Sequence, residues 1–227
     1  MIALIPAKGS SERIPNKNRT LIAGKPLLGW TIEALRRSQL ISSIYVSSES
    51  IEIEKITIEF GAIPHRRPVH LCNPKTPIRP VVQEFLLNQP LLENEQKILV
   101  VLPTAALITS QLIETAYKAI EDHPDKYACA FSCVSYGHPI ERSFTIKDGS
   151  LIRRFPDVDV LVQTQNFETS FHDAGTFYLG TRDFFLSQHT VFDGHGLPVV
   201  VPGYEGLDVD WPEDLVMLEA LLRYQYQ

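Results

Sequence analysis

The chain has 227 residues, of which 44% are hydrophobic and 21% are charged. This ordinary globular composition excludes a wholly disordered protein and suits one large or two small domains. Lysine and arginine total 21 against 27 aspartate and glutamate residues, a formal net charge of −6. A general binder of nucleic acid or of anionic membranes is therefore not expected, because both attract positively charged surfaces.

Neither a membrane span nor a secretory signal is expected. The most apolar stretch, 98–108, is interrupted by Pro103 and Thr104 and is too short to cross a bilayer. No basic segment precedes the apolar N-terminus. Three cysteines are too few, and odd in number, for a disulfide framework, so we expect reduced thiols in a cytoplasmic protein.

Four short apolar runs in the first two-thirds of the chain predict strands at 2–5, 44–46, 98–102 and 128–134. They are continuous rather than alternating, which is typical of strands buried on both faces of a parallel sheet. Helical spacing lies between them, in the sets Leu28, Ile32, Leu35 and Ile113, Ala116, Ile120. Segments 48–60 and 79–88 are weaker helix candidates.

The last third of the chain has a different pattern. Segments 143–146 and 151–154 flank the turn pair Asp148 and Gly149, which predicts a β-hairpin. Further strands are expected at 177–179 and 199–201. A final helix should begin at Pro212, with Glu213 and Asp214 at its positive end and a buried stripe formed by Leu215, Leu218 and Leu222.

These elements indicate an α/β fold with a doubly wound, mixed but mostly parallel sheet. We find no internal repeat and no linker, so residues 1–227 are expected to form one domain. Residues 135–165 are expected to project from it as a hairpin element.

The loop after the first strand, 6–18 (PAKGSSERIPNKN), is the most informative segment. In a doubly wound sheet it lies at the carboxyl edge, where ligands bind. Between residues 8 and 25 there are five cations, Lys8, Arg13, Lys17, Arg19 and Lys25, and one acid, Glu12. Gly9, Ser10 and Ser11 permit a turn that directs N–H groups inward. The pattern predicts a site for a small polyanion, with a solvated basic loop as the alternative.

Other phosphate-binding motifs are not satisfied. Gly24 and Lys25 superficially suggest a P-loop, but Pro26 stands where that motif needs Ser or Thr. No dinucleotide fingerprint follows the first strand, because Gly9 is the only glycine before Gly24.

Five blocks, in order along the chain, resemble the nonulosonic acid cytidylyltransferases, which include CMP-sialic acid synthetases and a pseudaminic acid branch. The blocks are IPAKGSSERIPNKN with LIAGKPLLGWTIEAL, then VVLPTA, SYGHPIERSF, FHDAGTFYLGT and LDVDWPEDL. The resemblance implies a Rossmann-like nucleotidyltransferase fold. It also implies transfer of CMP from CTP to an acidic nine-carbon sugar, with release of pyrophosphate, in bacterial surface-glycan or flagellin modification. Members are commonly homodimers whose hairpin reaches into the neighbouring subunit.

The resemblance assigns nucleotide binding to the matching positions Pro6, Ala7, Lys8, Gly9, Ser10, Ser11, Arg13, Lys17, Asn18, Pro103 and Thr104. The three cationic residues among these positions, Lys8, Arg13 and Lys17, are expected to be catalytic because they offset the charge of the triphosphate. Asn18 is expected to contact the base or the sugar of the nucleotide.

Asp208 and Asp210 are the expected ligands of Mg²⁺. Residues i and i+2 of an extended segment point the same way, so both carboxylates can reach one ion. The alternative is that these acids only precede the last helix and that Asp210 helps to start it.

The resemblance places Gln165, Asp173 and Tyr178 near the sugar pocket, although Asp173 also suits a hairpin turn. Arg142 is assigned to the substrate carboxylate, because a planar guanidinium suits that group.

Several positions depart from the family pattern, namely Lys8, Ser10, Glu12, Ser48, Glu49, Asn73, Ile78, Arg79 and Gln163. Glu12 adds a negative charge where a triphosphate is expected, and Arg79 is a possible replacement for a lost positive group. Two alternatives therefore stay open. One is a cytidylyltransferase for another acidic sugar, such as 3-deoxy-manno-octulosonate; the other is a catalytically silent nucleotide-binding homologue.

Overall fold

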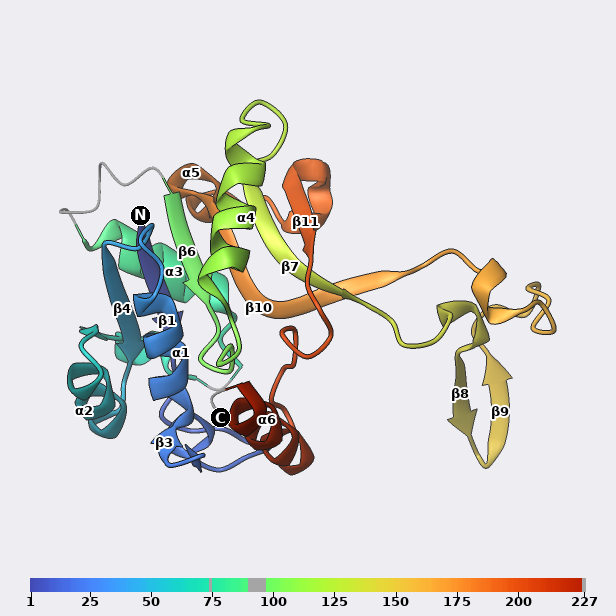
Figure 1. Cartoon of the computed structure of the whole chain (residues 1–227), viewed down its shortest axis with the longest axis horizontal. Coiled ribbons are helices and arrows are strands. Elements are labelled where there is room, and N and C mark those ends of the chain that lie inside the picture. Colours follow the sequence, from blue (N-terminus) through green and yellow to red (C-terminus); the bar gives the residue numbers. More distant parts are fainter. Residues whose placement is uncertain (74, 90–96, 226–227) are drawn as a thin grey trace.

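A computed structural model describes residues 1–73, 75–89 and 97–225. Its centre is a seven-stranded sheet in the order β11-β7-β10-β6-β1-β4-β5 (Figure 1). The strands are β1 (Ile2–Pro6), β4 (Ser43–Ser48), β5 (Ile63–Arg66), β6 (Lys97–Val101), β7 (Cys129–Ser135), β10 (Phe171–Thr181) and β11 (Gly196–Val200). Strand β10 runs antiparallel to β6 and β7, and the other pairs are parallel. The expected mixed, mostly parallel sheet is confirmed.

Helices cover both faces of the sheet. The helices are α1 (Leu27–Arg36), α2 (Ile51–Glu59) and α4 (Ser110–Glu121) on one face, and α3 (Ile78–Leu87) and α5 (Arg182–Leu186) on the other. Along β1, Ala3 and Ile5 enter the first core and Ile2 and Leu4 enter the second. Burial of alternate side chains in two cores is why this strand is apolar at every position.

A third core joins the end of the chain to its beginning. Helix α6 (Pro212–Gln225) buries Leu218 and Leu222 against Trp30 and against the short hairpin β2 (Leu21–Ile22) and β3 (Lys25–Pro26). Leu215 is only partly buried there. No helix in the described ranges is long and apolar enough to cross a lipid bilayer.

The predicted strands and helices are present, with some changes at their ends and one omission. Helix α2 begins later than 48 because β4 extends through Ser48, and the Ser50 hydroxyl caps the helix by accepting a hydrogen bond from the Ile53 N–H. Strand β10 is far longer than the predicted 177–179. Strand β5 was not predicted, because Pro64 within it is tolerated only on an edge strand.

A bulge divides β10. Asp173 pairs with Cys133, but the next registered pair is Tyr178 with Phe131, so the residues between them loop out. The hydroxyl of Ser132 accepts hydrogen bonds from the N–H groups of residues 176 and 177, at 3.1 and 3.2 Å. Gly175 adopts φ +64° within the bulge. These bonds fix the bulge that follows Asp173 in β10.

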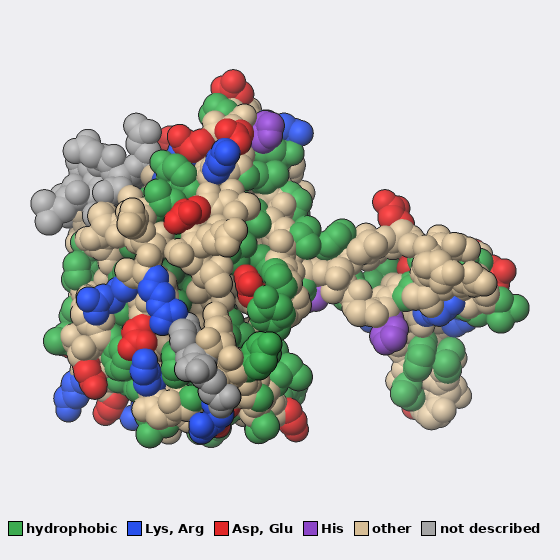
Figure 2. Space-filling view, viewed as in Figure 1, with side chains coloured by type: hydrophobic (Ala, Val, Ile, Leu, Met, Phe, Trp, Pro, Cys, Tyr) green, Lys and Arg blue, Asp and Glu red, His purple; other side chains and the backbone are tan. Residues whose placement is uncertain are grey.

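Residues 136–170 form an arm that leaves the sheet from the end of β7 and returns into β10 (Figure 1). It carries the predicted hairpin, β8 (Phe144–Lys147) and β9 (Ser150–Arg153), with Asp148 and Gly149 at the turn, both at positive φ. Figure 2 shows the arm as a lobe on a narrow neck, with hydrophobic side chains on the hairpin. Such a hairpin is marginally stable unless it packs on another surface.

Replacing Gly175 by Ala should destabilise the protein by about 1 kcal/mol, because an L-residue is strained at positive φ. Urea unfolding measures the change in the free energy of unfolding. Gly137→Ala is the matched control, since this glycine lies in open space without a positive φ. Equal stability of the two variants would contradict the prediction.

Candidate functional site

The basic loop and the acidic segment 207–210 meet across one site. The Arg13 Nη1 lies 2.6 Å from Asp210 Oδ2, and the Lys17 Nζ lies 3.5 Å from Asp210 Oδ1. The Lys17 ammonium also donates to the Val209 carbonyl at 2.5 Å. The loop is thus tied to the other end of the chain and is not a freely solvated basic segment.

Val209 lies between the two aspartates and is fully buried in the core formed by α6 and the loop, together with Ile14 and Trp30. The charges of Asp210, Lys17 and Arg13 all act on the Asp208 carboxyl, so the two flanking carboxylates lie near the same cations. Their joint presentation to one metal ion stays a prediction.

Asp214 caps the start of α6. Its Oδ2 accepts hydrogen bonds from the N–H groups of Asp210 and Trp211, at 2.8 and 2.7 Å. Asp214 therefore caps the helix, and the Asp210 side chain pairs instead with the cations Arg13 and Lys17 of the loop.

Asp208 lies deeper than Asp210. The Thr104 hydroxyl donates to Asp208 Oδ1 at 3.3 Å, and the preceding Pro103 carbonyl accepts a hydrogen bond from Thr31 at 2.8 Å. Burial, and then the charge of Asp210, raise the pKa of the Asp208 carboxyl above its usual range. Lys17, Thr104 and Arg13 oppose this shift without cancelling it.

The aspartate pair fits a magnesium ion. Mg²⁺ usually takes one or two carboxylates and fills its other positions with phosphate oxygens and water. Within residues 1–73, 75–89 and 97–225, no three His, Cys, Asp or Glu side chains gather in a metal-binding cluster. Two hard carboxylates whose charges disfavour each other would hold such an ion, with phosphate and water as its remaining ligands.

Asn18 anchors the start of the loop from the inside. Its Nδ2 donates to the Lys8 carbonyl at 2.8 Å, while its buried Oδ1 has no hydrogen-bond partner in the described structure. The Lys8 ammonium reaches the Thr76 carbonyl at 3.4 Å. Burial, and then the Arg67 charge, lower the pKa of Lys8. A buried amide oxygen with no protein partner is a natural contact for a ligand.

Gly9 approaches the turn after β4 too closely for any side chain. A Cβ at this position would lie 2.4 Å from the Ser50 Cβ. Its N–H donates to Glu49 Oε1 at 2.8 Å. Of the N–H groups expected to face a phosphate, that of Gly9 is thus directed at a carboxylate.

The remaining predicted loop positions have diverse surroundings. Pro6 and Ala7 are buried at the end of β1, where the Ala7 N–H donates to the Ser47 carbonyl. The Ser11 hydroxyl accepts from the Ile14 N–H at 3.5 Å, and Ser10 and Glu12 are exposed. Glu12 faces solvent, and its charge, with that of Glu49, partly opposes the lowering of the Lys8 pKa.

Arg67 was not predicted from the sequence, yet it lies under this loop with only 1% of its side chain exposed. Its Nη2 donates to the Ser47 carbonyl at 2.6 Å, and its Nη1 lies 3.9 Å from Glu49 Oε2. Neither of those last two atoms has a hydrogen-bond partner among the described residues. The available signal was its place directly after an edge strand, at the carboxyl edge of the sheet.

Asp173 and Tyr178 are joined across the bulge of β10. The Tyr178 hydroxyl donates to Asp173 Oδ2 at 2.6 Å, and Asp173 Oδ1 accepts from the Gly175 N–H at 2.8 Å. Burial, and then the bond to Asp173, raise the pKa of Tyr178, so the phenol keeps its proton. Asp173 therefore lies within β10 beside the bulge and not in a hairpin turn, and it lines a cavity of about 510 Å³ together with Asp208.

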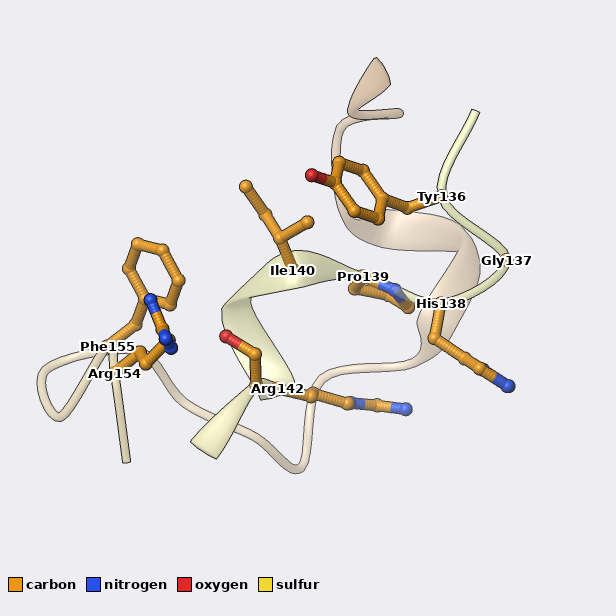
Figure 3. Close-up of a pocket in the computed structure, with 9 residues that line it drawn as sticks. Tyr136, Gly137, His138, Pro139, Ile140, Arg142, Arg154 and Phe155 are labelled. Carbon is orange, nitrogen blue, oxygen red and sulfur yellow. The ribbon is translucent and has the colours of Figure 1, made fainter. Parts of the chain in front are cut away.

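Arg142 and Gln165 lie in the arm, away from Asp173 and Tyr178 of the same chain (Figure 1). The Arg142 guanidinium donates to Thr164 and to the Val162 carbonyl, and it lines a separate cavity of about 820 Å³ (Figure 3). Gln165 donates to the Gln163 side chain at 2.7 Å. One chain therefore does not bring the four predicted sugar-binding residues together.

Arg79, the possible replacement for a lost positive group, lies on α3. Its guanidinium donates to the carbonyls of Ser187 and His189, and it lines a cavity together with Asp173 and Tyr178. Its role as a replacement for a lost positive group stays a prediction.

Comparison with known proteins decides the family. The model of the family described as Cytidylyltransferase matches residues 2–196. The chain belongs to the cytidylyltransferase family. The expected enzyme class, a nucleotidyltransferase, is confirmed by this membership and by the names of its relatives.

Curated relatives span the whole chain. The pseudaminic acid cytidylyltransferase of Campylobacter jejuni is 27% identical over 230 residues, covering 100% of this chain and 97% of that protein. The CMP-N,N'-diacetyllegionaminic acid synthase of Legionella pneumophila is also 27% identical and covers 98% of this chain and 96% of its own. The family resemblance drawn from the sequence blocks is confirmed.

Solved structures show the same fold. A CMP:2-keto-3-deoxy-manno-octonic acid synthetase complexed with CTP superposes with a TM-score of 0.71 at 16% identity, over 99% of this chain and 98% of that one. A 4-diphosphocytidyl-2C-methyl-D-erythritol synthase gives 0.64 at 16% identity, over 97% of both chains. The Rossmann-like nucleotidyltransferase fold is confirmed.

Replacing Asp208 by Asn should stabilise the folded protein at neutral pH while it reduces turnover by about 100-fold or more. The folded carboxyl has a raised pKa, so its ionisation opposes folding fully above that pKa, and this penalty is lost as the pH falls from the folded pKa to the ordinary pKa of an aspartate. Thermal unfolding across pH 4–8 checks the sign. Asp125→Asn, at an exposed position after α4, is the control; a less stable Asp208→Asn at neutral pH would contradict the prediction.

Proposed function

We propose that this protein transfers CMP from CTP to a nonulosonic acid of the sialic-acid type, with pseudaminic acid as the preferred acceptor, and releases pyrophosphate. The observation that carries the proposal is the pairing of Arg13 and Lys17 with Asp210 across one site. A nucleoside triphosphate needs cations for its phosphates and carboxylates for its metal ion, and this site supplies both.

In the proposed reaction the anomeric hydroxyl of the sugar attacks the α-phosphorus of CTP. The new O–P bond forms as the bond to the β-phosphate oxygen breaks, and the hydroxyl proton is released to solvent. Such a step depends on alignment and on neutralisation of charge. Lys8, Arg13 and Lys17 would neutralise the charge of the triphosphate. The buried Asn18 Oδ1, which has no hydrogen-bond partner among the described residues, would accept a hydrogen bond from the nucleotide.

We propose that Asp208 and Asp210 hold Mg²⁺. When bound, this ion supplies positive charge to the phosphate oxygens. Arg13 and Lys17, which pair with Asp210 in this structure, would then turn to the phosphates. Each cation lies close enough to the metal site to make this exchange by side-chain rotation.

For the acceptor, we propose that Asp173 and Tyr178 bind the sugar, because Asp173 shares a cavity with Asp208. Arg142 and Gln165 would serve the site of a second copy of the chain, reached by the arm. A homodimer of this kind also covers the exposed hairpin residues Ile146 and Leu151. The three free thiols suit a cytoplasmic enzyme.

The names of the relatives favour a nonulosonic acid over 3-deoxy-manno-octulosonate. Full-length relatives act on pseudaminic and N,N'-diacetyllegionaminic acids by name, whereas the octonic acid synthetase resembles this chain in fold at 16% identity. Against a silent homologue stand the intact Lys17, Asn18, Asp208 and Asp210. Glu12 and Gln163, the two departures that favour silence, are both exposed.

The test is release of pyrophosphate from CTP and Mg²⁺ with pseudaminic acid, N-acetylneuraminic acid or 3-deoxy-manno-octulosonate. We expect turnover with the first, and a rise in the KM for CTP of about 10-fold or more in Lys17→Ala, because a charge-assisted contact is lost. CTP binding by calorimetry without pyrophosphate release on any of the three sugars would support the silent homologue instead.

A dimer in solution should depend on the arm. Ile146→Asp, which places a charge on the exposed hairpin face, should shift the protein toward monomer in sedimentation at micromolar concentration. Val216→Asp on α6, a residue exposed to a similar degree, is the control and should not. A wild-type monomer at that concentration would refute the proposed homodimer.

A further inference from the structure

Helices α3 and α5 are joined by side-chain hydrogen bonds that run from one helix to the main chain of the other. The Gln83 amide group lies 3.1–3.3 Å from the carbonyl oxygens of residues 185, 186 and 187. Arg79, one turn earlier on α3, donates to the carbonyls of Ser187 and His189. In the reverse direction, Arg182 of α5 donates to the Leu86 carbonyl at 3.0 Å.

The segment held in this way forms a wall of a cavity of about 280 Å³. Three aromatic side chains of the segment line the cavity, namely Phe184, Phe185 and Phe192. From the sheet, Val100, Asp173 and Tyr178 contribute to the lining, and Arg79 itself is part of it. The cavity is mostly apolar, with one hydrogen-bonded acid and phenol at its edge.

Asp173 belongs to two cavities. It lines this apolar cavity with Tyr178, and it lines the larger cavity with Asp208. If Asp173 holds a sugar whose reacting hydroxyl faces Asp208, the far end of that sugar, with its less polar substituents, lies beside the apolar cavity. The position of the segment that carries Phe184, Phe185 and Phe192 then determines which substituents fit.

Helix α5 has only five residues and gains little stability from its own hydrogen bonds. The donors that fix the end of this helix and the following segment come from α3. Arg79 also lies against the Phe184 ring, with its guanidinium carbon 5.8 Å from the ring centroid. The depth of the apolar cavity thus depends on Arg79 and Gln83. The hydrogen-bonding groups of these two side chains are directed to main-chain carbonyls and need not contact the acceptor.

We propose that Arg79 and Gln83 are positioning residues for acceptor specificity: they hold the segment 184–192 as the wall of the apolar cavity beside Asp173. This inference rests on the proposed function, because it concerns the acceptor of that same reaction. It assigns a role to Arg79, a position where this chain departs from its family.

The decisive variant is Gln83→Glu, which keeps the size of the side chain but replaces its N–H donors by an acceptor facing three carbonyls. We expect the KM for pseudaminic or N-acetylneuraminic acid to rise by about 3- to 10-fold, with the KM for CTP unchanged. Arg79→Gln should behave alike, and Arg79→Lys, which keeps a charged donor, should recover part of the loss. The affinity of the free sugar, measured by calorimetry with CTP and without metal, should fall in parallel.

Arg182→Gln is the matched control. It removes a hydrogen bond between the same two helices, but it leaves the carbonyls of residues 185, 186, 187 and 189 bound to Gln83 and Arg79. It should lower the thermal stability without changing the KM for the sugar. A rise in the sugar KM for Arg182→Gln equal to that for Gln83→Glu would show that the hydrogen bonds of Arg79 and Gln83 have only a general structural role. That result would overturn the inference.

An unchanged sugar KM in Gln83→Glu and Arg79→Gln, with an active wild type, would also overturn it while leaving the proposed function intact. A wild type that neither binds nor converts any acidic sugar would overturn the proposed function and this inference together. The two failures are therefore distinguished by the wild-type measurement.

Discussion

The candidate site depends on charges from opposite ends of the chain meeting over a buried valine. Lys17 donates to the carbonyl of Val209, a residue 192 positions later, and pairs with Asp210 beside it. This contact exists because α6 packs on the short hairpin β2–β3 and buries Val209. Apolar burial of one side chain thereby fixes two carboxylates and two cations, none of which would hold this geometry as exposed ion pairs.

The position of the site was predictable because it follows from topology. A loop after the first strand of a doubly wound sheet lies at the ligand-binding edge, and Lys17 was found there. That Asp208 and Asp210 lie near each other was predictable from their i, i+2 spacing, whereas their role as metal ligands stays a prediction. Arg67 was not, because Pro64 obscures the strand that leads to it. The Asp173–Tyr178 bond also has no local signature: it is created by a bulge whose bonds come from Ser132 on another strand.

The residues matched to the sugar pocket divide between two lobes. Asp173 and Tyr178 lie at the sheet, whereas Arg142 and Gln165 lie in the arm, where Arg142 lines a separate cavity (Figure 3). Sequence blocks report order along the chain and not distance in space, so they could not distinguish a shared pocket from a divided one. The division is explained if the arm of one subunit completes the pocket of another, which is the arrangement proposed above.

The match to the family ends at residue 196, whereas Asp208 and Asp210 come after it. During synthesis on the ribosome, the basic loop is made early, whereas Asp210, which pairs with Arg13 and Lys17 of this loop, is made late. Domains made from the N-terminus onward begin to fold before they are finished. The sheet can therefore assemble before α6 is made, and the contacts of Lys17 with Val209 and Asp210 form only after the segment that carries them has packed on the loop.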